Sequence, residues 1–367
     1  MTRWAWAEVS SSAIEHNVRA LRQLVAPSQL WAVVKADGYG HGSVLAARAA
    51  LAGGADGLCV ALVQEGLALR AAGIEGPILV LSEQPPSQTR AAIEAGLQLT
   101  VYSEVGVQAV ADAGARAHPV HLKVDTGMRR VGAHTSEALA IAQAIERSPA
   151  TSLAGVLTHL AVADDPAHDF TEQQLDRFDV VLGVLHDAGI DPPLVHAANS
   201  AGALAHPRAR FDMVRAGIAI YGISPGPGVD HLCTGLRPAM QLKARVAHVK
   251  RVTGGERISY GLRHAFDRDT TVATLPVGYA DGVPRRLHAV GGTVLVGGEP
   301  RPIVGVVTMD QTMVDCGDDM VDVGDEAVLI GSQGDYTITA ADWADKLETI
   351  AYEIVCGVSA RMERRPV

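Results

Sequence analysis

The sequence predicts an α/β fold in which an N-terminal (β/α)8 barrel of the TIM type precedes a C-terminal, mostly β domain. Three observations lead to this prediction. Short apolar runs alternate with Ala-rich stretches of helical spacing over the first two-thirds of the 367 residues, eight such runs can be counted, and the pattern changes after Gly226. Continuous apolar runs are typical of parallel strands buried on both faces, and eight βα units make one barrel of ordinary size.

The eight apolar runs are the expected barrel strands. They are too short for helices and lack the period-two alternation of half-buried strands. They lie at 30–34, 58–62, 78–81, 97–101, 120–124, 153–158, 194–198 and 214–221. A helix is expected before the first strand at 12–24, and others between strands at 44–51, 64–72, 104–113, 137–145 and 172–187.

The last third of the chain has a different pattern. Pro225-Gly226-Pro227-Gly228 is typical of a loop or linker, and the segments after it alternate with period two, as half-buried antiparallel strands do. A late helix is expected at 340–348, with Thr339 as its N-cap and Asp342 three residues on. We therefore expect residues 1–230 to form the barrel and 231–367 the β-rich domain, with strands at 241–252, 271–276, 293–296, 303–308 and 327–330.

Composition excludes several classes of function. The net charge of −10 argues against nucleic acid or an anionic membrane as a partner. We see no secretory signal and no apolar run of about 18 residues, so no membrane span is expected. The four cysteines lie far apart without a C-x-x-C pair, and no histidine spacing suggests a metal site. The expected location is the reducing cytoplasm.

Polar side chains follow several of the predicted strands. Lys35 comes directly after the first strand, Arg130 lies in the loop after the fifth, and His159, His196 and Arg215 belong to the last three. In such a barrel, groups at the carboxyl ends of strands form the active site. Burial would lower the pKa of Lys35 toward that of an amine able to form a Schiff base, although position alone is equally consistent with a lysine that extends to solvent.

These segments resemble the signatures of the alanine racemase family. The stretch from Ala32 to Gly42, which contains Lys35, resembles the attachment signature for pyridoxal 5′-phosphate (PLP). Further resemblances follow in the family's order over nearly the whole chain, at 121–128, 196–201, 213–222, 259–261, 278–282 and 309–311. The resemblance implies a PLP-dependent isomerase that interconverts L- and D-alanine, supplies D-alanine for peptidoglycan precursors, and works as a homodimer with shared active sites.

The resemblance also implies a two-base mechanism. Lys35 would hold PLP as a Schiff base and act as one catalytic base. Tyr260 of the partner subunit would be the other base, on the opposite face of Cα. A phenol with a pKa near 10 is a poor base in water, and the family pattern assigns His159 and Arg215 to the relay that assists it. Arg215 would also donate to the pyridine nitrogen, which an arginine cannot readily protonate.

The remaining implied roles concern binding. Tyr39 and Ser200, with the backbone N–H groups of Gly217 and Ile218, would bind the cofactor phosphate, because N–H groups at a turn form an anion site. His196 and Tyr221 complete the expected cofactor-binding set. The substrate carboxylate would meet Arg130 and the backbone of Met309 and Asp310, and Tyr279 would line the entry to the site.

Some positions depart from the family pattern. Arg129 precedes Arg130 where many relatives have glycine, Thr308 stands where many have cysteine, and Ala360 replaces a common phosphate-contacting tyrosine. The lysine that matches Lys123 is carbamylated in some relatives. The alternatives are a racemase with a broader preference that includes serine, a PLP-dependent decarboxylase on the same barrel, and a non-catalytic PLP carrier. The last lacks a β domain, whereas this sequence carries one with Tyr260.

Overall fold

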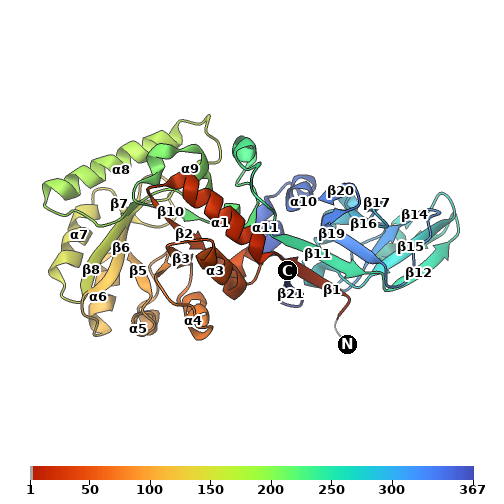
Figure 1. The fold of residues 1–367 in the computed structure, drawn as a ribbon, viewed down its shortest axis with the longest axis horizontal. Coiled ribbons are helices and arrows are strands. Elements are labelled where there is room, and N and C mark those ends of the chain that lie inside the picture. The colour runs from red at the N-terminus through yellow and green to blue at the C-terminus, as the bar shows by residue number, and fades with distance from the viewer. Residues whose placement is uncertain (1–2) are drawn as a thin grey trace. The chain divides into compact units, whose positions relative to one another are not determined.

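The computed structural model describes residues 3–367, which form two compact units (Figure 1). The first unit comprises Ser12–Gly38 and Ser43–Arg237. The second comprises the N-terminal segment up to Ser11, the short segment Tyr39–Gly42, and Pro238–Val367. The structure thus divides the chain after Arg237, and of the described residues the second unit also takes in 3–11, which the sequence assigned to the barrel.

The first unit is a parallel β-barrel, as predicted. Its eight strands are hydrogen-bonded in the order β10-β2-β3-β4-β5-β6-β8-β9, and every pair is parallel. Two backbone bonds of 3.0 Å, from Arg215 N to Ala198 O and from Asp212 N to Val195 O, link the ends of this series. The strands are β2 (Gln29–Val33), β3 (Gly57–Val60), β4 (Ile78–Val80), β5 (Gln98–Val101), β6 (His118–Asp125), β8 (Thr151–Leu157), β9 (Val195–His196) and β10 (Met213–Ala216).

Helices surround these strands, as the barrel end of Figure 1 shows. In α1, Ile14, Val18 and Leu21 are buried at a spacing of three and four residues, which places one apolar stripe against the strands. The expected helices are confirmed, and α5, which begins at a proline, and α9 are additions. Their bounds are α1 (Ser11–Val25), α3 (Ser43–Ala52), α4 (Val63–Ala71), α5 (Pro86–Glu94), α6 (Glu104–Asp112), α7 (Ala138–Arg147), α8 (Phe170–Asp187) and α9 (Ser200–Ala205).

Two strand predictions were wrong. The run at 214–221 is a strand only to Ala216, and a 3-10 turn, η2 (Ile218–Tyr221), replaces its second half. The segment 303–308 is a loop with a single bridge from Ile303 to Val314. Gly305 adopts a φ of +67° there, which turns the chain out of the extended conformation.

The second unit is built on mostly antiparallel sheets, as predicted, with one parallel pair between β1 and β21. Its largest sheet has the order β17-β16-β19-β11-β1-β21, a second has the order β12-β15-β18, and a two-stranded ribbon pairs β13 with β14. The segment 241–252 forms two strands instead of one. Bounds are β1 (Ala5–Val9), β11 (Met240–Arg245), β12 (His248–Val252), β13 (Arg257–Ile258), β14 (His264–Ala265), β15 (Thr270–Leu275), β16 (Thr293–Val296), β17 (Glu299–Pro302), β18 (Thr312–Asp315), β19 (Glu326–Gln333) and β21 (Glu363–Pro366).

The predicted late helix is confirmed as α10 (Ala340–Leu347). Thr339 and Asp342 form the expected capping box, in which the Thr339 hydroxyl accepts a bond from the Asp342 N–H at 3.0 Å. The helix α11 (Ala351–Cys356) follows it. No helix between residues 3 and 367 has the length and apolar character that crossing a membrane requires.

Candidate active site

Lys35 begins a single left-handed turn at the end of β2. Ala36, Asp37, Gly38 and Tyr39 all have positive φ values, between +52° and +62°. Non-glycine residues adopt this conformation at a cost of about 1–2 kcal/mol each, so neighbouring contacts must hold the turn. Asp37 accepts a bond from Ser43 N at 2.8 Å, and Glu65 accepts one from Ala36 N at 2.7 Å. The turn places the half-buried Lys35 at the carboxyl end of the barrel.

Four cationic side chains act on one another in this barrel end. Burial and, after it, the charges of Arg215, Arg130 and Lys35 together lower the pKa of Lys123 to about 7, against the opposing effect of Asp125. Lys123 donates to Leu81 O at 3.1 Å. Because positive charge predominates among these groups, the site is suited to anions such as a phosphate or a carboxylate.

Arg215 is buried on β10 and is held by three acceptors. Its Nη2 donates to Thr158 O at 2.8 Å and Ala197 O at 2.9 Å, and its Nη1 contacts His196 Nδ1 at 2.8 Å. Burial lowers its pKa to about 10, so it remains a cation at neutral pH. The guanidinium is therefore a fixed donor.

The histidines beside Arg215 are neutral. Burial, followed by the charge of Arg215, holds the pKa values of His159 and His196 well below the usual value. His159 Nδ1 lies 3.4 Å from Arg215 Nη2, and His196 bonds to His121 at 2.9 Å. A neutral imidazole accepts at one nitrogen and donates at the other.

Ser200 lies at the start of α9 and faces the turn after β10. Its Oγ accepts bonds from Gly217 N at 2.8 Å and Ala219 N at 3.3 Å. Ile218 lies between these two residues in the buried η2 turn, and Tyr221 at its end donates to Val33 O at 3.1 Å. The structure thus brings together Ser200 with Gly217 and Ile218.

The second unit holds the other predicted residues, beginning with Tyr260. It lies in the turn of the β13–β14 ribbon with 74% of its surface exposed. Ser259 before it adopts φ +66° and ψ −178°, a region that side chains strongly disfavour. The Ser259 hydroxyl donates to Val306 O at 3.0 Å, and Gly305 leaves room for the Ser259 side chain. The phenol is thus presented to solvent on a constrained turn.

The segments of Tyr279 and Met309 lie side by side and are joined by backbone hydrogen bonds. Tyr279 N donates to Thr308 O at 2.9 Å, and Ala280 N donates to Met309 O at 3.0 Å. A Cβ on Gly278 would lie 2.2 Å from Thr308 O, so only glycine permits this approach. The side chains of Tyr279 and Met309 are both exposed.

Tyr39, the remaining predicted residue, is buried, and the centroid of its ring lies 6.1 Å from that of the Tyr352 ring.

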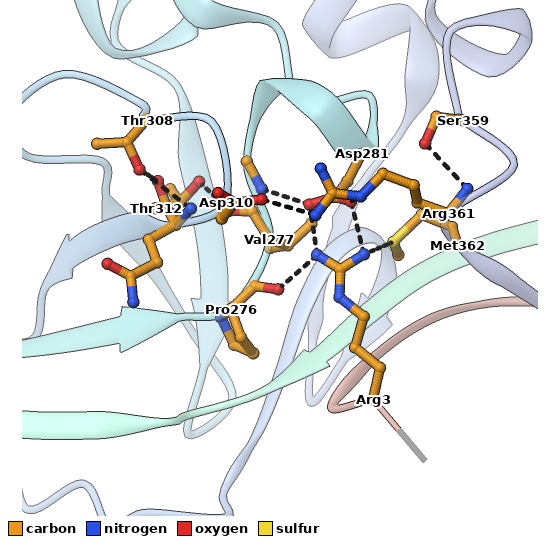
Figure 2. Close-up of polar contacts among 12 residues, drawn as sticks. Arg3, Pro276, Val277, Asp281, Thr308, Asp310, Thr312, Ser359, Arg361 and Met362 are labelled. Carbon is orange, nitrogen blue, oxygen red and sulfur yellow. Dashed lines mark hydrogen bonds and ion pairs between the residues drawn. The ribbon is translucent and has the colours of Figure 1, made fainter.

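A network of ion pairs supports the segments of Tyr279 and Asp310 (Figure 2). Arg3 donates two hydrogen bonds of 2.6 Å to the fully buried carboxylate of Asp281, and Arg361 lies 3.3 Å from the same carboxylate. Arg361 also pairs with Asp310 at 2.6 Å. Asp281 additionally accepts from Gly278 N at 2.9 Å, and Arg361 links the two segments because it pairs with both Asp281 and Asp310.

The charge of Arg130 lowers the pKa values of Lys123 and His159, although Arg129 and Arg130 are both exposed. Gln98 and Gly155 contact His121 but were not predicted as site residues. A polar residue within an otherwise apolar barrel strand, as at Gln98 and His121, was the available signal.

The barrel residues fit PLP by the chemistry of their donors. PLP carries an aldehyde, a phosphate and a ring nitrogen, and a strand-end amine, the Ser200 turn and a fixed guanidinium match these groups in kind. Burial raises the pKa of the nearby Cys59 thiol to about 12, which leaves it an unreactive neutral group. The arrangement can therefore bind an anionic cofactor and an amino acid.

Comparisons with known proteins agree over the whole chain. The family model "Alanine racemase, N-terminal domain" matches residues 9–225, and "Alanine racemase, C-terminal domain" matches 239–366. Alanine racemase of Symbiobacterium thermophilum is 48% identical over 99% of this chain and 97% of its own. The crystal structure of alanine racemase from Bacillus anthracis with bound L-Ala-P has a TM-score of 0.95 at 39% identity and covers 100% of this chain and 96% of its own.

One protein of similar fold is named for a different substrate. Histidine racemase from Leuconostoc mesenteroides subsp. sake has a TM-score of 0.92 at 30% identity, covering 100% of this chain and 98% of its own. The alanine racemases are more similar in sequence, and both family models match. The chain belongs to the alanine racemase family.

Proposed function

We propose that this chain interconverts L-alanine and D-alanine, with PLP bound in the barrel through Lys35. The observation that carries the proposal is the convergence of Lys35, Lys123, Arg130 and Arg215 at the carboxyl end of one barrel, beside neutral histidines. Family membership supports the same activity. When bound, PLP supplies an electron sink that makes the Cα proton of an attached amino acid acidic.

The barrel residues would hold the cofactor by complementary chemistry. Lys35 Nζ would bind it covalently, and Arg215 would donate to its ring nitrogen. Its phosphate would be bound by Ser200 with the N–H groups of Gly217 and Ile218, and by Tyr39. His196 orients Arg215 through the bond of 2.8 Å, and Tyr221 secures the η2 turn through its bond to Val33 O.

Two bases on opposite faces of Cα would perform the racemisation. Once the amino acid has displaced it, Lys35 Nζ would remove or return the proton on one face. Tyr260 Oη of the partner subunit would do so on the other. A single base tends to return the proton to the face it came from. The neutral His159 and the cationic Arg215 would assist the phenol. His159 Nδ1 faces the Arg215 donor, so its Nε2–H would donate to the phenol oxygen, and Arg215 would stabilise negative charge.

Substrate binding requires a cation for the carboxylate. Arg130 would form this charge-assisted pair, with the backbone of Met309 and Asp310 beside it and Tyr279 at the entry. The loop of Met309 is held through Ala280 N and through the Asp310–Arg361 pair.

Mixing two inactive variants tests the shared site. Lys35→Ala and Tyr260→Phe should each be inactive in racemisation. If each site takes Lys35 from one subunit and Tyr260 from the other, a mixed dimer has one intact site. Random exchange of subunits in a symmetric dimer should then restore about one quarter of wild-type activity. No restored activity, with mixed dimers demonstrated by native mass spectrometry, would show that both bases come from one chain.

Proton exchange in heavy water tests the two roles directly. With PLP added, Lys35→Ala and Tyr260→Phe should each lose exchange at Cα from one enantiomer of alanine. Unchanged exchange from both enantiomers in Tyr260→Phe would exclude it as a base. L-serine and L-histidine in the same assay test substrate breadth, because a hydroxyl is rejected only weakly by an apolar pocket. Equal rates for serine would support the broader racemase.

A further inference from the structure

Four side chains are bonded in series through the interior of the barrel. Arg215 Nη1 on β10 contacts His196 Nδ1 on β9 at 2.8 Å. His196 Nε2 contacts His121 Nδ1 on β6 at 2.9 Å, and His121 Nε2 contacts Gln98 Oε1 on β5 at 2.8 Å. Arg215, His196 and His121 are buried, and Gln98 is half-buried. We call these four residues the barrel relay.

The hydrogen bonds of the barrel relay can run in only one direction, with each residue donating to the next from Arg215 to Gln98. A guanidinium only donates, so His196 Nδ1 must accept, and a neutral His196 then bears its proton on Nε2. That N–H donates to His121 Nδ1, which leaves the His121 proton on Nε2, directed at the Gln98 amide oxygen. Both imidazoles are neutral, because burial lowers the pKa of His121 to about 3 and that of His196 well below its usual value. Donor and acceptor therefore agree at every junction.

The backbone of β8 leaves room for the contact between His121 and His196. β8 lies between β6 and β9 in the sheet, and its Gly155 is level with the contact between the two histidines. A Cβ at Gly155 would lie 2.6 Å from His121 Nδ1 and 2.7 Å from Leu194 O. The register between β6 and β8 also shifts between Val120 and His121. A side chain on β8 would displace His121, so the glycine keeps the passage open.

We propose that Gln98 and His121 are positioning residues for Arg215, because they fix the tautomer of His196 that presents an acceptor to the guanidinium. The effect on catalysis rests on the proposed function, since it acts through the contact of Arg215 with the cofactor. The tautomer itself is a property of the protein alone. Gln98 lies at the start of β5, at the end of the barrel opposite Lys35, and thus acts at a distance from the reacting atoms.

Loss of the acceptor at Gln98 has two possible outcomes, and both reach Arg215. If His121 keeps its proton on Nε2, that buried N–H has no partner and the ring is free to move. If the proton shifts to Nδ1, His196 Nε2 must accept it, and the His196 proton then faces the Arg215 donor. Two donors in contact repel, so the guanidinium must shift.

Three variants isolate the role of the amide oxygen. Gln98→Leu removes the acceptor, and Gln98→Glu keeps one. Gln29→Leu is the matched control, because Gln29 is also a half-buried first residue of a barrel strand and also accepts from a ring N–H, that of Trp31 at 3.0 Å. The Trp31 ring packs edge-on against His121 at 6.5 Å between centroids, so this variant disturbs the surroundings of His121 without removing its acceptor. Histidine 15N spectra, assigned with His121→Asn and His196→Asn, report the tautomers, and the absorbance of bound PLP against pH reports the environment of Arg215.

The expected results separate positioning from stability. Wild type and Gln98→Glu should show His121 and His196 with the proton on Nε2. Gln98→Leu should change the His196 signal, shift the pH titration of bound PLP and lower kcat about tenfold with KM nearly unchanged, as loss of a supporting residue does. Gln29→Leu should lower stability without these changes.

Two results would overturn the proposal. One is a proton on His196 Nδ1 in the wild-type protein. The other is a Gln98→Leu protein whose His196 signal and PLP titration match wild type, whatever its stability. If the chain bound no PLP, the proposed function would fail, while the 15N spectra would still decide the direction of the barrel relay.

Discussion

Replacing Asp281 with alanine should cost the protein about 3 kcal/mol of unfolding free energy. The carboxylate is fully buried and accepts two bonds of 2.6 Å from Arg3 and one of 2.9 Å from Gly278 N (Figure 2). Removing one partner of a buried ion pair typically costs about 3–5 kcal/mol, because the other charge loses its partner. Arg3 is 30% exposed, so water can solvate part of its charge, and the low end of that range applies.

Asp318→Ala is the matched control for this substitution. Asp318 also lies between two arginines of the second unit, Arg251 at 2.6 Å and Arg268 at 3.3 Å, but its side chain is 71% exposed. Exposed ion pairs contribute little because water and salt screen them, so this variant should unfold nearly as wild type does. Each aspartate has two arginine partners, so the difference in unfolding free energy between the two variants reports the effect of burying the carboxylate.

Urea unfolding followed by tryptophan fluorescence measures both variants. Three of the four tryptophans, Trp4, Trp6 and Trp343, belong to the second unit, so the signal reports mainly on it. Equal losses in the Asp281 and Asp318 variants would refute the argument from burial. Although burial alone would raise it, the pKa of Asp281 is lowered by the bond from Arg3. The contribution should therefore be present at neutral pH and disappear as the pH falls below about 4.

Two further predictions concern the active-site segments. Lys123→Met should stabilise the cofactor-free protein by at least about 1 kcal/mol at pH 7, because burial and the neighbouring positive charges lower the pKa of Lys123 to about 7. The penalty of the buried charge is complete below pH 7 and fades toward the ordinary lysine pKa, so the advantage in thermal unfolding should shrink by pH 9.5; a variant less stable than wild type at pH 7 would contradict this. Ser259→Ala keeps the strained φ of +66° and loses the bond to Val306 O, whereas Ser259→Gly relieves the strain. Calorimetry should find the glycine variant about 1 kcal/mol more stable than the alanine variant, with lower kcat in both, and the reverse order of stability would disprove strain at this turn.

Local sequence patterns predicted most of the barrel correctly because its units are formed by neighbours in the chain. Each unit consists of an apolar strand and the helix that follows it in the chain, and it packs against the next unit. The hydrophobic periodicity of a short segment therefore identifies each strand and helix. The prediction of a strand at 214–221 was wrong from Gly217 on, where the apolar run continues as a 3-10 turn. The prediction of a strand at 303–308 was wrong because Gly305 turns the chain out of the extended conformation. Neither change in conformation alters the hydrophobicity of the segment, and the prediction was based on hydrophobicity.

The sequence failed at pairings between distant segments. β1 joins β11 and β21, whose residues lie more than 230 positions away, so no local pattern assigns the first residues to the second unit. The same limit applies to the ion pair between Arg3 and Asp281. The family resemblance identified Lys35 and Tyr260 as candidates, and their roles stay predictions that the variants above can test.

The sequence by itself determined the (β/α)8 pattern, the capped helix α10 and the strand-end positions of Lys35 and Arg215, because periodicity, capping and chain order are local properties. Only the tertiary structure decided which donor meets which acceptor. The bond between His121 and His196, the passage that Gly155 leaves for it, and the approach of Gly278 to Thr308 depend on backbones brought together by folding. Hydrogen bonds act over about 3 Å, a distance that no spacing along the chain can specify.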